Sequence, residues 1–251
     1  MRNFGGATRA DVVVALSAVL MFVAVTAGAV QNARQDARLA LCAGNMRLLG
    51  AACLSYAGEW DQTLPPEMLR GVQDLTPAHS SQITDIDSNP WSFGRLLANG
   101  YLSTPRVMFC PAQNVARFSV DSAIEPEWPK RIPEATAGYL YQVHSVRNPG
   151  ITPYNASYKK HFGNGDFFVC AAFDKVSEFP TNLFLTMEVV DSVNSVPHNS
   201  GTTMNALFID GSVKVATTDE YLKALKVRPD SPMANMQSFS EVVTMWENGV
   251  K

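Results

Sequence analysis

A long uncharged segment near the N-terminus constrains the fold of this 251-residue chain more than any other feature. The run from Val12 to Val30 contains no charged residue, stays uncharged to Ala33, and ends at Arg34. A helix needs about 20 such residues to cross the roughly 30 Å hydrocarbon layer of a membrane. The run is apolar on every side, so it has no amphipathic face of the kind that packs on a protein core. We therefore expect a membrane-spanning segment rather than a core helix.

The residues before this run predict its orientation. Arg2 and Arg9 precede it, which favours a cytoplasmic N-terminus. A cleaved secretory signal peptide is the competing interpretation, because Thr26–Ala29 offers small residues for a cleavage site. The run is, however, longer than the apolar region of about 7–15 residues that signal peptides carry.

The residues after the run extend the same helix. The segment from Gln31 to Leu41 has no helix breaker and is rich in helix formers. Apolar positions then recur at steps of three to five and form one stripe: Leu41, Met46, Leu49, Cys53 and Tyr56. The pattern predicts one helix from about residue 8 to about residue 57, roughly 75 Å long. Its first half is apolar all round, and its second half presents one face to a globular domain.

The remaining sequence indicates a β-rich head. Hydrophobic residues make up 46% of the chain, which is enough for a core, and the net charge of −3 gives no electrostatic reason to bind nucleic acid. A short helix is predicted at Trp91–Ala98, because Asn99-Gly100 ends it. The strand candidates are one near Gly138–Val146, Cys170–Lys175, and Leu183–Val190, in which Phe184 and Thr186 alternate with Leu185 and Met187.

The clearest local signal is a hairpin over residues 205–215. Asp210-Gly211 lies between two strand-like runs, which is typical of a type I′ turn with positive φ at both turn residues. In that register the facing pairs are Ile209–Ser212, Phe208–Val213 and Ala206–Val215, with the last two pairs on the core side. A structural role explains both turn residues, so we assign no catalytic role to Asp210.

Four cysteines limit the possible disulfides, namely Cys42, Cys53, Cys110 and Cys170. None has the C-x-x-C spacing of a metal or redox site. Cys42 and Cys53 would lie about 16 Å apart on one helix, too far for the roughly 7 Å limit between bridged Cα atoms. Buried free thiols at Cys53 and Cys170 are as reasonable as a second bridge.

Catalytic and ligand signals are few. The sequence has no Gly-x-Ser-x-Gly elbow, no His-Glu-x-x-His motif and no phosphate loop. The four histidines are scattered, and only His198 draws interest, because its ring could fasten its loop to the Asp210-Gly211 hairpin. We predict no catalytic residue, no cofactor and no metal ligand.

The N-terminal layout resembles the type IV pilin-like proteins, in particular the pseudopilins of type II secretion-like systems. Their short basic leader ends in Gly, and an acidic fifth mature residue precedes the apolar helix. Gly6 matches the last leader residue, Ala7 the first mature residue and Asp11 the acidic one. The chain departs from the family in Ala7 for Phe, Arg9-Ala10 for an apolar pair, and Asp11 for Glu. An ordinary boundary charge is the alternative role for Asp11.

Downstream blocks extend the resemblance to about residue 215. The segment 42–56, with Cys42, Asn45 and Tyr56, resembles a Cys-x-x-Asn-Leu block of one pseudopilin-like subgroup. Phe109-Cys110-Pro111 resembles its Phe-x-Cys-Pro segment, and His198 with Asp210-Gly211 resembles its terminal His…Asp-Gly motif, although with eleven intervening residues instead of nine. The resemblance favours a Cys42–Cys110 disulfide.

The resemblance implies an α+β fold, in which the long N-terminal helix packs on a small antiparallel sheet with long loops. Residues 1–6 would be the leader, 7–33 the transmembrane half, 34–58 the amphipathic half, and 59–251 an extracytoplasmic head. The implied function is that of a structural, non-catalytic subunit of a type II secretion-like or pilus-like assembly in the cytoplasmic (inner) membrane.

The implied partners are membrane lipid, other pilin-like subunits and a prepilin peptidase, but no nucleic acid. Two other functions stay open. One is a monomeric bitopic surface protein whose head binds a glycan or other extracellular polymer. The other is an exported enzyme, which is supported only by the scattered His and Asp residues.

Overall fold

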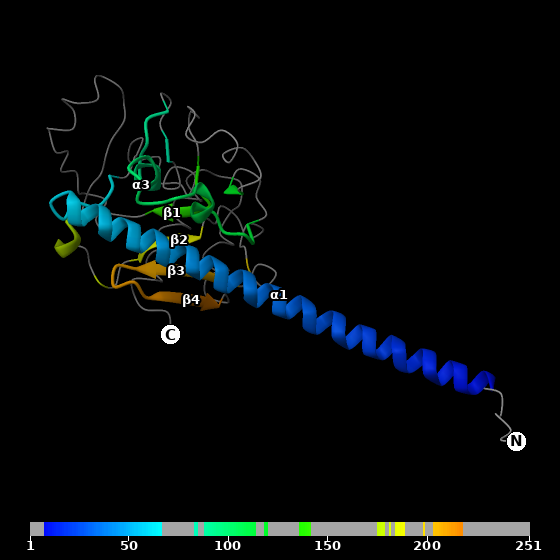
Figure 1. The fold of residues 1–251 in the computed structure, drawn as a ribbon. Coiled ribbons are helices and arrows are strands. Elements are labelled where there is room, and N and C mark those ends of the chain that lie inside the picture. Colours follow the sequence, from blue (N-terminus) through cyan, green and yellow to red (C-terminus); the bar gives the residue numbers. More distant parts are fainter. Residues whose placement is uncertain are drawn as a thin grey trace, which may run out of the picture.

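Helix α1 (Arg9–Glu59) is one continuous element of 51 residues. The computed structural model describes residues 8–66, 83–84, 88–113, 118–119, 136–141, 175–178, 181, 184–188, 198 and 203–217. The helix runs without a break through the segment around Gly28, as the sequence predicts. Its first half projects alone from the head, and its second half lies along the sheet (Figure 1).

The two ends of α1 are defined by local hydrogen bonds. At the start, the Thr8 side chain accepts the backbone N–H of Asp11 while the Asp11 carboxylate accepts the N–H of Thr8, which is a capping box. At the end, the Trp60 N–H donates to Tyr56 O, and Asp61 and Gln62 follow with positive φ values of 52° and 63°. Two consecutive left-handed residues cannot continue the helix, which therefore stops two residues beyond the predicted end.

The head contains a four-stranded antiparallel sheet in the order β1-β2-β3-β4. Its strands are β1 (Tyr139–Tyr141), β2 (Phe184–Glu188), β3 (Thr203–Phe208) and β4 (Val213–Thr217). The short elements are α3 (Phe93–Ala98) and the 3-10 helices η2 (Pro105–Met108) and η5 (Val176–Glu178). The α+β class is thus confirmed, and α3, β1 and β2 lie within the predicted segments.

The strand predicted at Cys170–Lys175 falls almost wholly outside the described residues. Its last residue, Lys175, forms an isolated antiparallel bridge with Thr63 just after α1. The Lys175 ammonium also contacts the exposed Asp61 carboxylate at 3.1 Å. This part of the chain therefore meets the end of α1.

The hairpin is present, but its predicted turn type and register are wrong. Gly211 donates its N–H to Phe208 O, and Phe208 donates its N–H to Ser212 O. Within this loop only Gly211 has positive φ, at 81°. This is a three-residue loop in which a type I turn is followed by a left-handed glycine. The extra loop residue shifts the pairing by one position. The observed partners are Leu207↔Val213, Ala206↔Lys214 and Asn205↔Val215.

The shift changes which side chains face the helix. Leu207 packs on Gly50 of α1, and the Asn205 amide lies near Leu39 O at 3.5 Å, so alternate residues of β3 point toward α1. Val215, predicted on the core side, is 45% exposed. Val215 pairs with Asn205 on the face toward α1, but it lies on β4, the edge strand of the sheet, where its side chain is only partly covered.

The rear half of α1 supplies one side of the core. Cys42, Met46, Leu49, Cys53 and Tyr56 are buried, whereas Leu41 is 58% exposed, so its predicted place on the stripe is wrong. Adjacent residues of a helix point about 100° apart. Because Cys42 lies on the buried face, Leu41 points away from it. The expected alternation within β2 is also absent, because all five of its residues are buried. A strand covered on both faces has no polar side to reveal a period of two.

Candidate functional site

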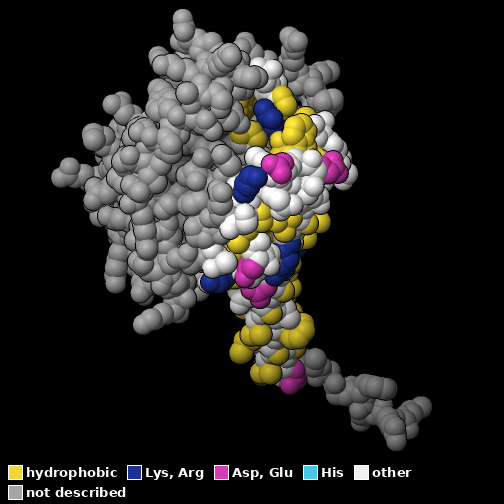
Figure 2. All heavy atoms as spheres, turned by 90° about the vertical axis from the view of Figure 1, so that its left-hand side faces the viewer, with side chains coloured by type: hydrophobic (Ala, Val, Ile, Leu, Met, Phe, Trp, Pro, Cys, Tyr) yellow, Lys and Arg dark blue, Asp and Glu magenta, His cyan; other side chains and the backbone are white. Residues whose placement is uncertain are grey.

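The first candidate site is the exposed apolar half of α1. Its large side chains are exposed by between 48% at Val30 and 73% at Val25. The other members are Val12, Val13, Val14, Leu16, Val19, Leu20, Met21, Phe22 and Val23. We call this exposed apolar half of α1, residues 12–30, the stem. Figure 2 shows apolar side chains gathered along the stem below the head. The helix is long and apolar enough to cross a membrane, and its most apolar stretch is not buried in the head.

The acidic residue at the tip of this stem has partners within its own chain. Asp11 Oδ2 accepts the N–H of Thr8 at 2.8 Å and the Thr8 hydroxyl at 2.7 Å. Placing a carboxylate at the N-terminus of a helix also stabilises it through the helix dipole. Asp11 therefore has a local role as a capping residue, while Gly6 and Ala7 lie outside the described residues.

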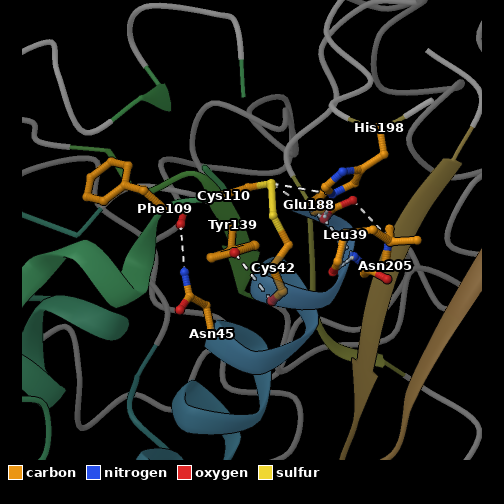
Figure 3. Close-up of a disulfide and its surroundings, with 9 residues drawn as sticks. All are labelled: Leu39, Cys42, Asn45, Phe109, Cys110, Tyr139, Glu188, His198 and Asn205. Atoms are coloured by element: carbon orange, nitrogen blue, oxygen red, sulfur yellow. Dashed lines mark hydrogen bonds and ion pairs between the residues drawn. A yellow bond between two sulfur atoms is a disulfide. The ribbon is translucent and has the colours of Figure 1, made fainter. Parts of the chain in front are cut away.

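The second candidate site is the junction that fastens α1 to the head. Cys42 of α1 is disulfide-bonded to Cys110, 68 residues away in sequence, with the two Cα atoms 5.1 Å apart. One helical turn further on, Asn45 Nδ2 donates to Phe109 O at 3.0 Å (Figure 3). Two of the sequence blocks behind the family resemblance thus meet in space. Pro111, which follows Cys110, is exposed in a turn.

A buried acid–base pair lies against this disulfide. His198 Nε2 is 2.7 Å from Glu188 Oε1, and their side chains are 1% and 0% exposed. Cys110 Sγ lies 3.5 Å from His198 Nε2 and 3.7 Å from Glu188 Oε1. Asn205 donates its backbone N–H to Glu188 Oε2 at 2.8 Å and its Nδ2 to Oε1 at 3.0 Å. Both oxygens of Glu188 therefore have polar partners, as buried polar atoms require.

The partner of His198 differs from the prediction. Its ring contacts Glu188 at the end of β2 and not the Asp210-Gly211 turn, although its backbone bridges Thr203 at the start of β3. Glu188 and Asn205 were not among the predicted site residues. A usable signal existed for Glu188, because it is the one charged residue in the apolar strand Phe184–Glu188. A lone charge in a buried strand needs a buried partner.

The remaining predicted residues are structural. Tyr56 is buried and stacks on Trp60 with ring centroids 5.2 Å apart, and it meets Tyr101 edge-on. Asp210 Oδ1 accepts the N–H of Ser212 at 2.8 Å, which stabilises the turn at Gly211. Among the described residues, Cys53 is a buried free thiol, and Cys170 lies outside them. These positions support the core and the hairpin.

A buried tyrosine completes the junction. Tyr139 of β1 donates its hydroxyl to Cys42 O at 3.4 Å. Burial, together with the nearby Glu188 carboxylate, raises the pKa of this phenol well above its ordinary value. The hydroxyl therefore stays protonated and acts as a donor.

The whole junction can hold a metal ion only if its sulfur atoms are not bonded to each other. Cys42, Cys110, Glu188 and His198 each offer one ligand atom, and these atoms lie within 4.8 Å of one another. With the disulfide formed, the same side chains instead brace the helix against the sheet. Comparison of the chain with protein-family models, curated protein sequences and solved structures gave no match.

Proposed function

We propose that this chain is a structural, membrane-anchored subunit of a pilus-like or type II secretion-like assembly. The observation that carries the proposal is the division of α1 into two halves with opposite surroundings. The first half leaves its apolar side chains exposed, and the second half is built into the core of the head. A single rigid element thus joins a lipid-compatible surface to a folded domain.

The exposed half of α1 needs an apolar environment. Burying one Val, Leu, Met or Phe side chain contributes about 1.5–3 kcal/mol, and the stem exposes eleven such large side chains between Val12 and Val30. A patch of this size on a soluble monomer would promote association. Lipid tails cover it in the membrane, and the corresponding helices of neighbouring subunits would cover it in a fibre.

The junction suits a subunit that must transmit force between its helix and its head. Three links connect α1 to the head at nearly the same level, namely the Cys42–Cys110 disulfide, the Asn45–Phe109 hydrogen bond and the Tyr139–Cys42 hydrogen bond. A pull along the helix is therefore transmitted to the head through covalent and buried polar contacts. Such bracing supports assembly rather than turnover.

The proposal extends to the N-terminus through the family resemblance. A prepilin peptidase would cut after Gly6, and Arg2 and Arg9 would keep the N-terminus on the cytoplasmic side of the inner membrane. Asp11 would then pair with the terminal amine of a neighbouring subunit, because an unpaired charge in an apolar fibre core is costly. The Asp11 carboxylate would share this role with its capping contacts to Thr8.

Mass spectrometry of the N-terminus of the chain isolated from membranes tests the processing step. We expect a chain that starts at Ala7, with or without a methylated amine. The matched control is Gly6→Leu, which should keep Met1 because the residue before the cut is altered. An intact Met1 in the unmodified chain would contradict processing.

Crosslinking in membranes tests assembly separately. A photoreactive phenylalanine analogue replaces Phe22, which is 70% exposed, and in the control it replaces the exposed Asn99 next to α3. We expect a ladder of multimers from position 22 and none from position 99. Monomers alone from position 22, together with binding of an extracellular glycan by the chain, would instead support a monomeric surface protein.

A further inference from the structure

The disulfide junction brings together four side chains of the kind that bind zinc. They are Cys42 from α1, Cys110 after η2, Glu188 at the end of β2, and His198 before β3 (Figure 3). All four are buried, and their ligand atoms lie within 4.8 Å of one another. Two sulfurs, one imidazole nitrogen and one carboxylate oxygen form a donor set that Zn²⁺ accepts in four-coordinate sites.

The spacing of these atoms is close to that of a zinc tetrahedron. With Zn–S near 2.3 Å and Zn–N or Zn–O near 2.0–2.2 Å, a sulfur and a nitrogen or oxygen ligand stand about 3.6 Å apart. Cys110 Sγ is 3.5 Å from His198 Nε2 and 3.7 Å from Glu188 Oε1. These two edges of the tetrahedron already have the required length.

Two other edges must lengthen for an ion to enter. The Glu188 Oε1 to His198 Nε2 contact is 2.7 Å, and it would open to about 3.3 Å around a tetrahedral ion. The two sulfur atoms are covalently joined, and they would have to separate to about 3.8 Å. The disulfide and the ion therefore exclude each other.

The surroundings of Glu188 resemble those of a metal-binding carboxylate. Asn205 holds both of its oxygens, through the backbone N–H to Oε2 and through Nδ2 to Oε1. Such hydrogen bonds fix the orientation of a ligand in advance. A divalent cation would also be a favourable partner for a carboxylate ligand at this buried position.

We propose that reduction of the Cys42–Cys110 disulfide converts this junction into a Zn²⁺ site with ligands Cys42, Cys110, Glu188 and His198. An external dithiol or phosphine reductant supplies two electrons, the S–S bond breaks, and two protons complete the two thiols as the reductant is oxidised. Binding of Zn²⁺ then releases both thiol protons, because the thiolate is the ligand. The ion replaces the covalent link between α1 and the head, so the junction is held in either redox state.

Metal binding by the full chain in detergent micelles tests this proposal, with ZnCl2 as the probe. After treatment with a phosphine reductant and removal of unbound metal, we expect one zinc per reduced chain and less than a tenth of that per oxidised chain. Zinc should also raise the Tm of the reduced chain and leave that of the oxidised chain unchanged. Equal zinc content in the two redox states would overturn the proposal.

Cobalt substitution identifies the ligands without any mutation. Co²⁺ added to the reduced chain should give the visible bands of a tetrahedral ion and the near-ultraviolet charge-transfer band of thiolate ligands. A spectrum without the thiolate band would overturn the assignment of Cys42 and Cys110.

Variants separate this site from the other cysteines. Cys110→Ser and His198→Ala should lower zinc affinity at least 100-fold, and Asn205→Ala about 10–100-fold because it removes the Nδ2 hydrogen bond to Glu188 Oε1. Cys53→Ala is the matched control, and it should bind one zinc, because Cys53 is buried outside the cluster. Far-UV circular dichroism checks that each variant keeps its helix. Unchanged affinity in a folded Cys110→Ser chain would refute the site.

Discussion

The side-chain amide of Asn45 in α1 donates a hydrogen bond to the backbone carbonyl of Phe109, with the two atoms 3.0 Å apart. The residue after Phe109 is Cys110, which is disulfide-bonded to Cys42. Cys42 and Asn45 lie three residues apart, so they share one face of the helix. Phe109 and Cys110 are consecutive, so two adjacent residues of the head meet this face. The hydrogen bond and the disulfide thus fix both the position and the rotation of α1 on the head.

The first prediction concerns this hydrogen bond. Asn45→Ala leaves the Phe109 carbonyl without this donor, and the loss should lower the free energy of unfolding by about 1–2 kcal/mol. For a domain of this size the Tm should fall by about 3–6 °C. Thermal unfolding in detergent, followed by near-UV circular dichroism, measures it. Arg47→Ala, at an exposed neighbouring position, should leave the Tm nearly unchanged.

The second prediction compares two glycines of the same helix. A Cβ at Gly50 would lie 2.6 Å from Leu207 Cδ2, whereas a Cβ at Gly44 would meet nothing within 4 Å. Gly44→Ala should stabilise the chain by up to about 1 kcal/mol through helix propensity. Gly50→Ala should be less favourable than Gly44→Ala by about 1–3 kcal/mol, because overpacking against Leu207 offsets the same gain. Thermal unfolding of the pair measures the difference, and equal effects would argue against close packing of α1 on β3.

The third prediction concerns the hairpin loop. Gly211 has a φ of 81°, a conformation that costs other L-residues about 1–2 kcal/mol. Gly211→Val should lower the free energy of unfolding by that amount or more, because β-branched residues tolerate positive φ worst. Gly211→Asn should cost less, since Asn adopts this region readily. If the Val and Asn variants have the same Tm as the unmodified chain, the turn is wrongly assigned.

The fourth prediction concerns the reactivity of Cys53. Burial raises the pKa of this thiol far above its ordinary value, so almost none of it is the reactive thiolate at pH 8. In a Cys170→Ser chain, Cys53 is the single cysteine outside the bridged pair. It should react with a disulfide reagent at least about 100-fold more slowly in the folded chain than in denaturant. Absorbance of the released thiolate measures both rates.

A Cys53→Ala change in the same background provides the control for this measurement and should abolish the slow reaction. Comparable rates in the folded and denatured chains would mean that position 53 is accessible.

Local chain properties account for what sequence analysis predicted well. The span of α1 follows from an uncharged run and the stripe that continues it, and both are readable within a few turns of helix. The position of the hairpin follows in the same way from Asp210-Gly211 between two strand-like runs. The length of its loop cannot be predicted in this way. The same sequence can form a loop with one residue more or fewer before Ser212, and this choice changes the register of the two strands.

A continuous apolar-to-amphipathic helix and a β-rich head could be predicted from the chain alone, since periodicity and turn chemistry are properties of neighbouring residues. The contact between Glu188 and His198 is visible only in the folded chain. Both residues lie against Cys110, which is 78 and 88 residues away in sequence. Contacts over such separations depend on how the helix and sheet pack. No local pattern specifies that packing, although the burial of a charge in β2 demands that some partner be found.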